Sequence, residues 1–120
     1  MPVKPIPDGY HTVTPYLTVP GVAALIDFLK TVFDAKEIER MASQDGRIMH
    51  AEVRIGDSVI MLGEPLGDSV PRPGSLYVYV NDTDRTYNRA LQAGAISVME
   101  PNDQFYGDRN AGVKDASGNF

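Results

Sequence analysis

Two residues with acid-base chemistry stand close together in a stretch whose polar and apolar residues alternate. His50 and Glu52 are two positions apart, so in a strand their side chains point to the same face. An imidazole beside a carboxylate can act as a general base or as a metal ligand. The sequence therefore predicts catalytic roles for His50 and Glu52. The alternative is a structural hydrogen bond from His50 at the start of a strand.

The strands on either side of this pair decide its electrostatic setting. In the simplest hairpin register, Glu52 faces Met61, and a carboxyl group partly out of water shifts towards its neutral form. In a second hairpin on the other side, Glu39 lies opposite Glu52, and the two carboxyl groups could share a proton. Arg54 could instead neutralise either carboxylate.

A sheet must position these side chains, and the first half of the chain has the pattern of one. Residues 1–11 lack periodicity and are rich in proline, which predicts an extended leader on the surface. Apolar residues three and four positions apart predict a helix from Val22 to Phe33, ended by Asp34. The turn dipeptides Asp45-Gly46 and Gly56-Asp57 predict a meander. The strands of this first module, residues 12–64, are expected at 14–19, 36–42, 48–55 and 59–62.

The second half repeats the same order of elements after a linker of turn-forming residues at 65–74. A strand is predicted at 75–80, a helix between the caps at 81–83 and Gly94, and a further strand at 95–99. This repetition predicts an α+β fold of paired βαβββ modules, whose curved mixed sheets surround a central cavity. The second module then spans 75–120. A generic α+β sandwich without duplication is the alternative.

Several stretches resemble the PhnB-like branch of the vicinal oxygen chelate superfamily, the glyoxalase/bleomycin-resistance fold. They are residues 9–19, 32–35, 49–62 and Tyr106-Gly107-Asp108-Arg109, and the resemblance covers Pro5 to Phe120. It implies one compact domain of paired βαβββ modules, usually in a homodimer. Members include glyoxalases, dioxygenases and drug-sequestering resistance proteins, so the fold does not choose the chemistry.

The resemblance also implies where a metal would lie. Metal-dependent members place His or Glu on the first, fourth, fifth and last strands, where this sequence has Thr14, Met61 and Ser75 at the first three positions. Hydroxyl and thioether groups are poor ligands for such ions. We therefore expect no metal of the glyoxalase type and no other cofactor, which leaves only an atypical site for a divalent metal.

The fourth ligand position would fall beyond Phe120, and residues 115–119 resemble the turn before the last strand. The second module is therefore expected to lack its last strand, which exposes a sheet edge. Either the sequence stops short of that strand or a partner chain covers the edge.

The predicted cavity lining suits an organic molecule, because tyrosines combine apolar contact with a hydroxyl group. The residues expected to bind it are Thr14, Tyr16, Thr18, Arg54, Met61, Ser75, Tyr77, Tyr79 and Arg109. The alternative for the tyrosines is that they fill the barrel. For Arg109 the alternative is an ion pair with Asp108 or Asp115.

Composition narrows the class of protein. The 120 residues include no cysteine and carry a net charge of −5, which argues against thiolate metal sites and nucleic-acid binding. No apolar run approaches a membrane span, so we expect a cytoplasmic protein.

The first functional hypothesis is a metal-free binder of a small organic molecule. The second is a lyase, isomerase or other enzyme that uses His50 and Glu52, and the third is a structural dimer or accessory domain.

Overall fold

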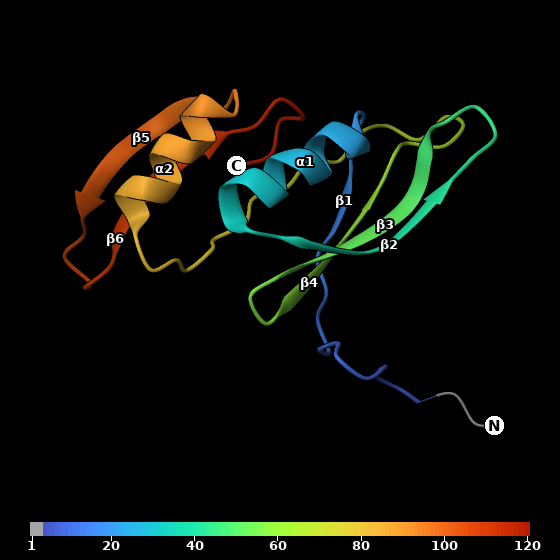
Figure 1. Cartoon of the computed structure of the whole chain (residues 1–120), viewed down its shortest axis with the longest axis horizontal. Coiled ribbons are helices and arrows are strands. Elements are labelled where there is room, and N and C mark those ends of the chain that lie inside the picture. Colours follow the sequence, from blue (N-terminus) through green and yellow to red (C-terminus); the bar gives the residue numbers. More distant parts are fainter. Residues whose placement is uncertain (1–3) are drawn as a thin grey trace.

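The computed structural model describes residues 4–120, so the first three residues of the predicted leader lie outside it. Figure 1 shows a four-stranded sheet beside one helix, and a separate hairpin beside a second helix. The elements of the described chain are β1 (Tyr16–Thr18), α1 (Val22–Phe33), β2 (Lys36–Ala42), β3 (Ile48–Ile55), β4 (Ser58–Gly63), α2 (Thr83–Gln92), β5 (Ile96–Asp103) and β6 (Arg109–Lys114). The fold is mixed α+β with curved sheets, as predicted.

The first sheet has the strand order β1-β4-β3-β2, with β1 parallel to β4 and the other pairs antiparallel. Its register is the predicted one: Glu52 pairs with Met61 in β4 and with Glu39 in β2. The turn at Gly56-Asp57 closes the pairing of β3 with β4, whereas the pairing of β2 with β3 contains two register shifts, between Glu37 and Glu39 and between Met41 and Ala42. A shift of one residue turns the following side chains to the other face. β1 is shorter than the predicted strand, and it begins just after Pro15, which has no N–H to donate.

Helix α1 covers one face of this sheet (Figure 1). Its apolar stripe is buried and packs with the inward residues of the strands, which places the main core between helix and sheet. That core includes Leu25, Ile26, Leu29, Ala51, Val53, Ile60 and Leu62. The helix ends where predicted, since Asp34 takes a left-handed conformation with φ of 55°.

The second half contains α2 and the antiparallel hairpin of β5 and β6. Asp82 caps α2, because its side chain accepts a hydrogen bond from the Arg85 backbone N–H. β5 begins one residue later than the predicted strand and runs on to Asp103, while β6 was not predicted. A small apolar cluster of Val32, Ala90 and Ala95 joins α1 to this half.

The predicted strand at 75–80 is the main error of the sequence interpretation. No strand forms there in the structure. Within residues 4–120, one backbone hydrogen bond joins this segment to another part of the chain, and a second lies directly before it. The Phe120 N–H donates to the Gly74 carbonyl (2.9 Å), and the Leu76 N–H donates to the Phe120 carbonyl (2.8 Å). A strand needs a continuous ladder on a neighbour, and residues 77–80 have none in the described chain.

No helix in the described part of the chain is long and apolar enough to cross a membrane.

Candidate functional site

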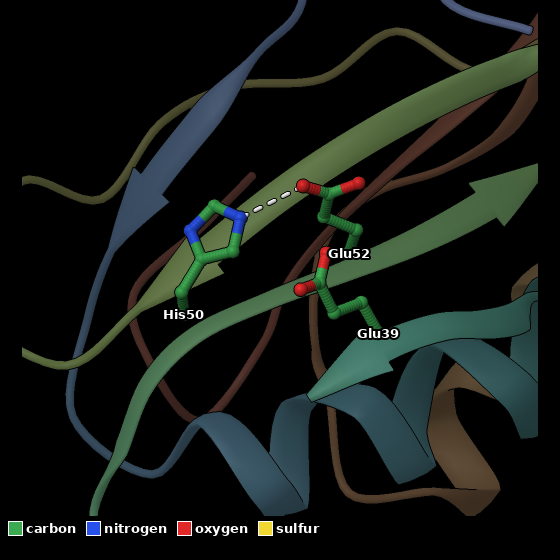
Figure 2. A group of neighbouring side chains, drawn as sticks. All are labelled: Glu39, His50 and Glu52. Atoms are coloured by element: carbon green, nitrogen blue, oxygen red, sulfur yellow. Dashed lines mark hydrogen bonds and ion pairs between the residues drawn. The ribbon is translucent and has the colours of Figure 1, made fainter. Parts of the chain in front are cut away.

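Glu39, His50 and Glu52 form a compact group on the face of the first sheet opposite α1, called here the β2–β3 cluster (Figure 2). One nitrogen or oxygen atom from each residue lies within 4.8 Å of those of the other two. The His50 Nε2 atom is 2.8 Å from Glu52 Oε2. The structure thus brings together the two predicted catalytic residues and a third side chain.

Strand alternation places the cluster on this face. Ala51 and Val53 point into the core against α1, so His50 and Glu52 point the other way. The pairing of Glu39 with Glu52 brings two carboxylates side by side across the strands. Arg54 makes no salt bridge to them in the described chain; its Nη1 atom instead donates to the Gly9 carbonyl at 3.2 Å.

The hydroxyl groups of two tyrosines lie next to the cluster. The Tyr10 hydroxyl, from the predicted leader, donates a hydrogen bond to Glu52 Oε1. The Tyr16 hydroxyl, on β1, lies 3.3 Å from His50 Nδ1. Glu52 is consequently only 6% exposed. The sequence interpretation missed Tyr10, because the leader has no periodicity that would indicate which of its side chains turns inward.

Glu52 is ionised more readily than its burial alone would allow. Burial raises the pKa of its carboxyl group, but hydrogen bonds from Tyr10 and His50 outweigh that effect and hold the pKa below its usual value. The predicted shift towards the neutral form was therefore wrong. The same hydrogen bond to Glu52 is the main reason that the pKa of Tyr10 is raised.

A cavity of about 910 Å³ lies elsewhere, between α1, α2, the extended segment 75–80 and β6. Its walls are largely apolar and include Leu29 and Phe33 from α1, Tyr87 and Ala90 from α2, and Val98 from β5. The cavity occupies the space beside the segment that was predicted to pair as a strand.

The lining of the cavity also includes polar side chains. The Tyr77 hydroxyl donates to Asp108 Oδ2 (2.8 Å), and Asn110 Nδ2 donates to the Tyr77 hydroxyl (3.2 Å). Asn110 lowers and Asp108 raises the pKa of Tyr77, and the net pKa lies above its usual value. The Tyr79 ring is tilted beside Tyr77, with centroids 5.3 Å apart. Asn110 was not predicted, since β6 was not recognised.

The structure separates the predicted site residues from one another. The cavity lining includes Ser75, Tyr77, Tyr79 and Arg109. The remaining predicted residues do not line it; they are Thr14, Tyr16, Thr18, His50, Glu52, Arg54 and Met61. One central cavity shared by the whole set is therefore not formed by residues 4–120.

The Arg109 guanidinium forms ion pairs with two aspartates. Its guanidinium donates to both Asp84 oxygens, at 2.7 and 3.1 Å, and to Asp103 Oδ1 at 3.1 Å. These bonds raise its pKa. The expected partners, Asp108 and Asp115, are not the ones it contacts.

Comparison with known proteins places the chain among relatives of the same fold. The sequence model of the family described as "Glyoxalase/Bleomycin resistance protein/Dioxygenase superfamily" matches residues 10–120. Uncharacterized proteins of Mycobacterium bovis and Mycobacterium tuberculosis are each 35% identical over 120 residues. The match covers 88% of this chain and 76% and 68% of theirs, respectively.

Two solved structures resemble the chain along most of their length. TioX from Micromonospora sp. ML1 has a TM-score of 0.71 and 23% identity, with 90% of each chain covered. A member of the same superfamily from Sphaerobacter thermophilus has a TM-score of 0.69 and 18% identity, with 91% of each chain covered. At these identities the likeness supports the fold alone.

Proposed function

Because the chain belongs to the Glyoxalase/Bleomycin resistance protein/Dioxygenase superfamily, we propose that it binds a small organic molecule in the cavity between its two halves. The ligand is expected to carry an aromatic ring together with amide or hydroxyl groups. The observation that supports this proposal is the cavity of about 910 Å³, whose lining combines apolar walls with hydrogen-bonding side chains. Its size and composition are those of sites for drug-sized ligands.

The apolar walls provide most of the contact area. Leu29 and Phe33 from α1 and Tyr87 from α2 line the cavity, so a planar ring would be held between the helices and the extended segment. The neighbouring rings of Tyr77 and Tyr79 add edge and face contacts of the kind that aromatic pairs prefer.

The polar groups suit amides and hydroxyls. Tyr77, Asp108 and Asn110 combine donors and acceptors in one hydrogen-bonded group. The backbone of 77–80 also has no backbone partner within residues 4–120. An amide-bearing ligand could pair with this backbone as a strand pairs with an exposed sheet edge.

The proposed ligand binds without the metal ion that metal-dependent members of the family use. The donors at the family's ligand positions are the hydroxyls of Thr14 and Ser75 and the thioether of Met61, which divalent ions of the glyoxalase type bind poorly. Ser75 lines the cavity, whereas Thr14 and Met61 do not. The cavity does not favour the alternative of a lyase or isomerase that uses His50 and Glu52, because neither residue lines it.

The assignment to the PhnB-like branch, the homodimer and the cytoplasmic location also remain proposals. The PhnB-like branch is supported by the resemblance of residues 9–19, 32–35, 49–62 and 106–109. The homodimer is supported by apolar side chains that are largely exposed, such as Ile96 and Phe105, since exposed apolar surface commonly marks interfaces. Sedimentation of the purified chain at micromolar concentration tests it, and a monomer at all concentrations would contradict it.

Calorimetric titration with bleomycin and with a panel of smaller aromatic amides tests the ligand proposal. We expect heat and saturation with at least one compound. The Tyr77→Phe variant keeps the ring and loses the hydroxyl that bonds Asp108 and Asn110. Its affinity is expected to fall about fivefold, equivalent to about 1 kcal/mol for one hydrogen bond.

Tyr16→Phe is the matched control, because Tyr16 loses the same atom but does not line the cavity. Its affinity should equal that of the native chain. Absence of heat with every compound would argue against the proposal. Weaker binding in Tyr16→Phe but not in Tyr77→Phe would indicate that the ligand binds near Tyr16 and not in the cavity.

A further inference from the structure

We propose that the β2–β3 cluster of Glu39, His50 and Glu52 binds a divalent transition-metal ion, at a site separate from the cavity. The family resemblance implies metal-ligand positions at Thr14, Met61 and Ser75, and the cluster contains none of these residues. The inference does not depend on the proposed small-molecule ligand, because no member of the cluster lines the cavity.

The three donor atoms are already close to a coordination geometry. They lie within 4.8 Å of one another, and His50 Nε2 and Glu52 Oε2 are only 2.8 Å apart. Ligand atoms about 2.0–2.2 Å from a zinc ion are separated by about 3–3.5 Å. A small side-chain rotation of Glu39, which is exposed, would bring the third atom into range.

The charges of the cluster favour a cation. Glu39 and Glu52 are direct cross-strand neighbours, and like charges in that position destabilise a sheet. The nearby Arg54 has its guanidinium bonded to the Gly9 carbonyl and makes no salt bridge to either carboxylate within residues 4–120. An ion between the two carboxylates would remove their repulsion.

Outer contacts orient two of the ligands. Tyr10 bonds Glu52 Oε1 and leaves Oε2 facing His50. Tyr16 lies beside His50 Nδ1 and leaves Nε2 facing Glu52. Metal-binding imidazoles and carboxylates commonly have such partners on the side away from the ion. The ion would replace the single hydrogen bond between His50 and Glu52.

The donor set indicates the class of ion. One imidazole nitrogen and two carboxylate oxygens suit Zn²⁺, Co²⁺ or Mn²⁺, whereas Mg²⁺ and Ca²⁺ prefer oxygen ligands throughout. Three protein ligands leave at least one position for water. Because the cluster belongs to adjacent strands of one sheet, its backbone is rigid enough to hold that geometry.

Zn²⁺ titration of the full chain, freed of metal by a chelator, tests the proposal. Calorimetry is expected to give one ion per chain, and Co²⁺ should produce visible absorption that Zn²⁺ abolishes. The chain has two histidines, so proton NMR provides an internal control. The imidazole signals of His50 should shift with Zn²⁺, and those of His11 should not.

Variants of two glutamates on β2 separate the site from general surface charge. Glu39→Gln is expected to weaken Zn²⁺ binding at least tenfold. Glu37→Gln removes the same charge from the same strand, but Glu37 pairs with Lys30 and Arg40 instead of the cluster. Its Zn²⁺ affinity should be unchanged, and circular dichroism should verify that both variants fold.

Three results would overturn the inference. They are no stoichiometric uptake of Zn²⁺ or Co²⁺, equal weakening by both glutamate variants, and Zn²⁺-induced shifts at His11 in place of His50. None of these results depends on whether the cavity binds an organic molecule.

Discussion

The Tyr16 hydroxyl lies directly over Gly63, so that a Cβ atom on Gly63 would come within 2.8 Å of it. The same Cβ atom would lie 2.6 Å from the Met49 carbonyl oxygen. Because glycine has no side chain, the space at this position stays open, and the Tyr16 hydroxyl can approach His50 through it. A glycine at the end of β4 thus shapes the β2–β3 cluster without contacting its carboxylates.

Gly63→Ala is expected to destabilise the fold by about 1–3 kcal/mol, the usual cost of an overpacked core position. The contact with the Met49 backbone cannot be relieved by rotating a side chain. Urea denaturation measures the change. Gly112→Ala is the matched control, because its Cβ would meet Val98 at an ordinary 3.6 Å, and it should lose less than about 0.5 kcal/mol. Equal losses would contradict this explanation.

Tyr10→Phe should destabilise the chain by about 1–3 kcal/mol, because it deprives the buried carboxylate of Glu52 of a hydrogen bond. The leader should also become easier to cleave, which limited proteolysis would detect. Tyr79→Phe removes the same atom from a side chain that is 81% exposed, and its stability should match that of the native chain. A neutral effect of Tyr10→Phe would show that the leader is not anchored by this contact.

Asp84→Asn should reduce the sensitivity of the fold to acid. Hydrogen bonds from Arg109 hold the pKa of Asp84 below its usual value. A lowered pKa stabilises the folded state above the unfolded pKa of about 3.9, and the contribution disappears as pH falls through the folded-state pKa. The urea midpoint of the native chain should therefore fall more steeply below about pH 4 than that of the variant.

Asp68→Asn, in the loop after β4, removes the same charge away from Arg109 and should retain the native pH profile. High salt should shrink the difference between Asp84→Asn and the native chain, since the Asp84–Arg109 pair is on the surface. Identical acid profiles for all three proteins at low salt would exclude a contribution from this ion pair.

Phe120→Pro should release the start of the segment 75–80, because proline cannot donate to the Gly74 carbonyl. Hydrogen exchange at the Leu76 amide is expected to accelerate about tenfold, equivalent to about 1.4 kcal/mol of local stability. Phe120→Ala retains the backbone N–H and should leave this exchange rate nearly unchanged. Faster exchange in both variants would assign the effect to the lost ring.

The amino-acid sequence by itself determined the first module. The spacing of apolar residues predicted α1 to its last residue, Phe33, and the two turn dipeptides predicted the pairing of Glu52 with Glu39 and Met61, although not the two register shifts within β2. Alternation then assigned His50 and Glu52 to the face away from α1. These features depend on contacts within a hairpin or along one helix, so a local pattern is sufficient to predict them.

Only the tertiary structure decided how distant segments meet. Residues 75–80 alternate like a strand but have no neighbouring ladder in the described chain, and alternation cannot reveal whether a partner strand is in place. Tyr10 reaches Glu52 across 42 positions, and Arg109 reaches Asp84 across 25. Such contacts depend on the docking of whole elements, which leaves no periodic signal in either segment. For the same reason, the sequence could not show that its predicted site residues do not share one cavity.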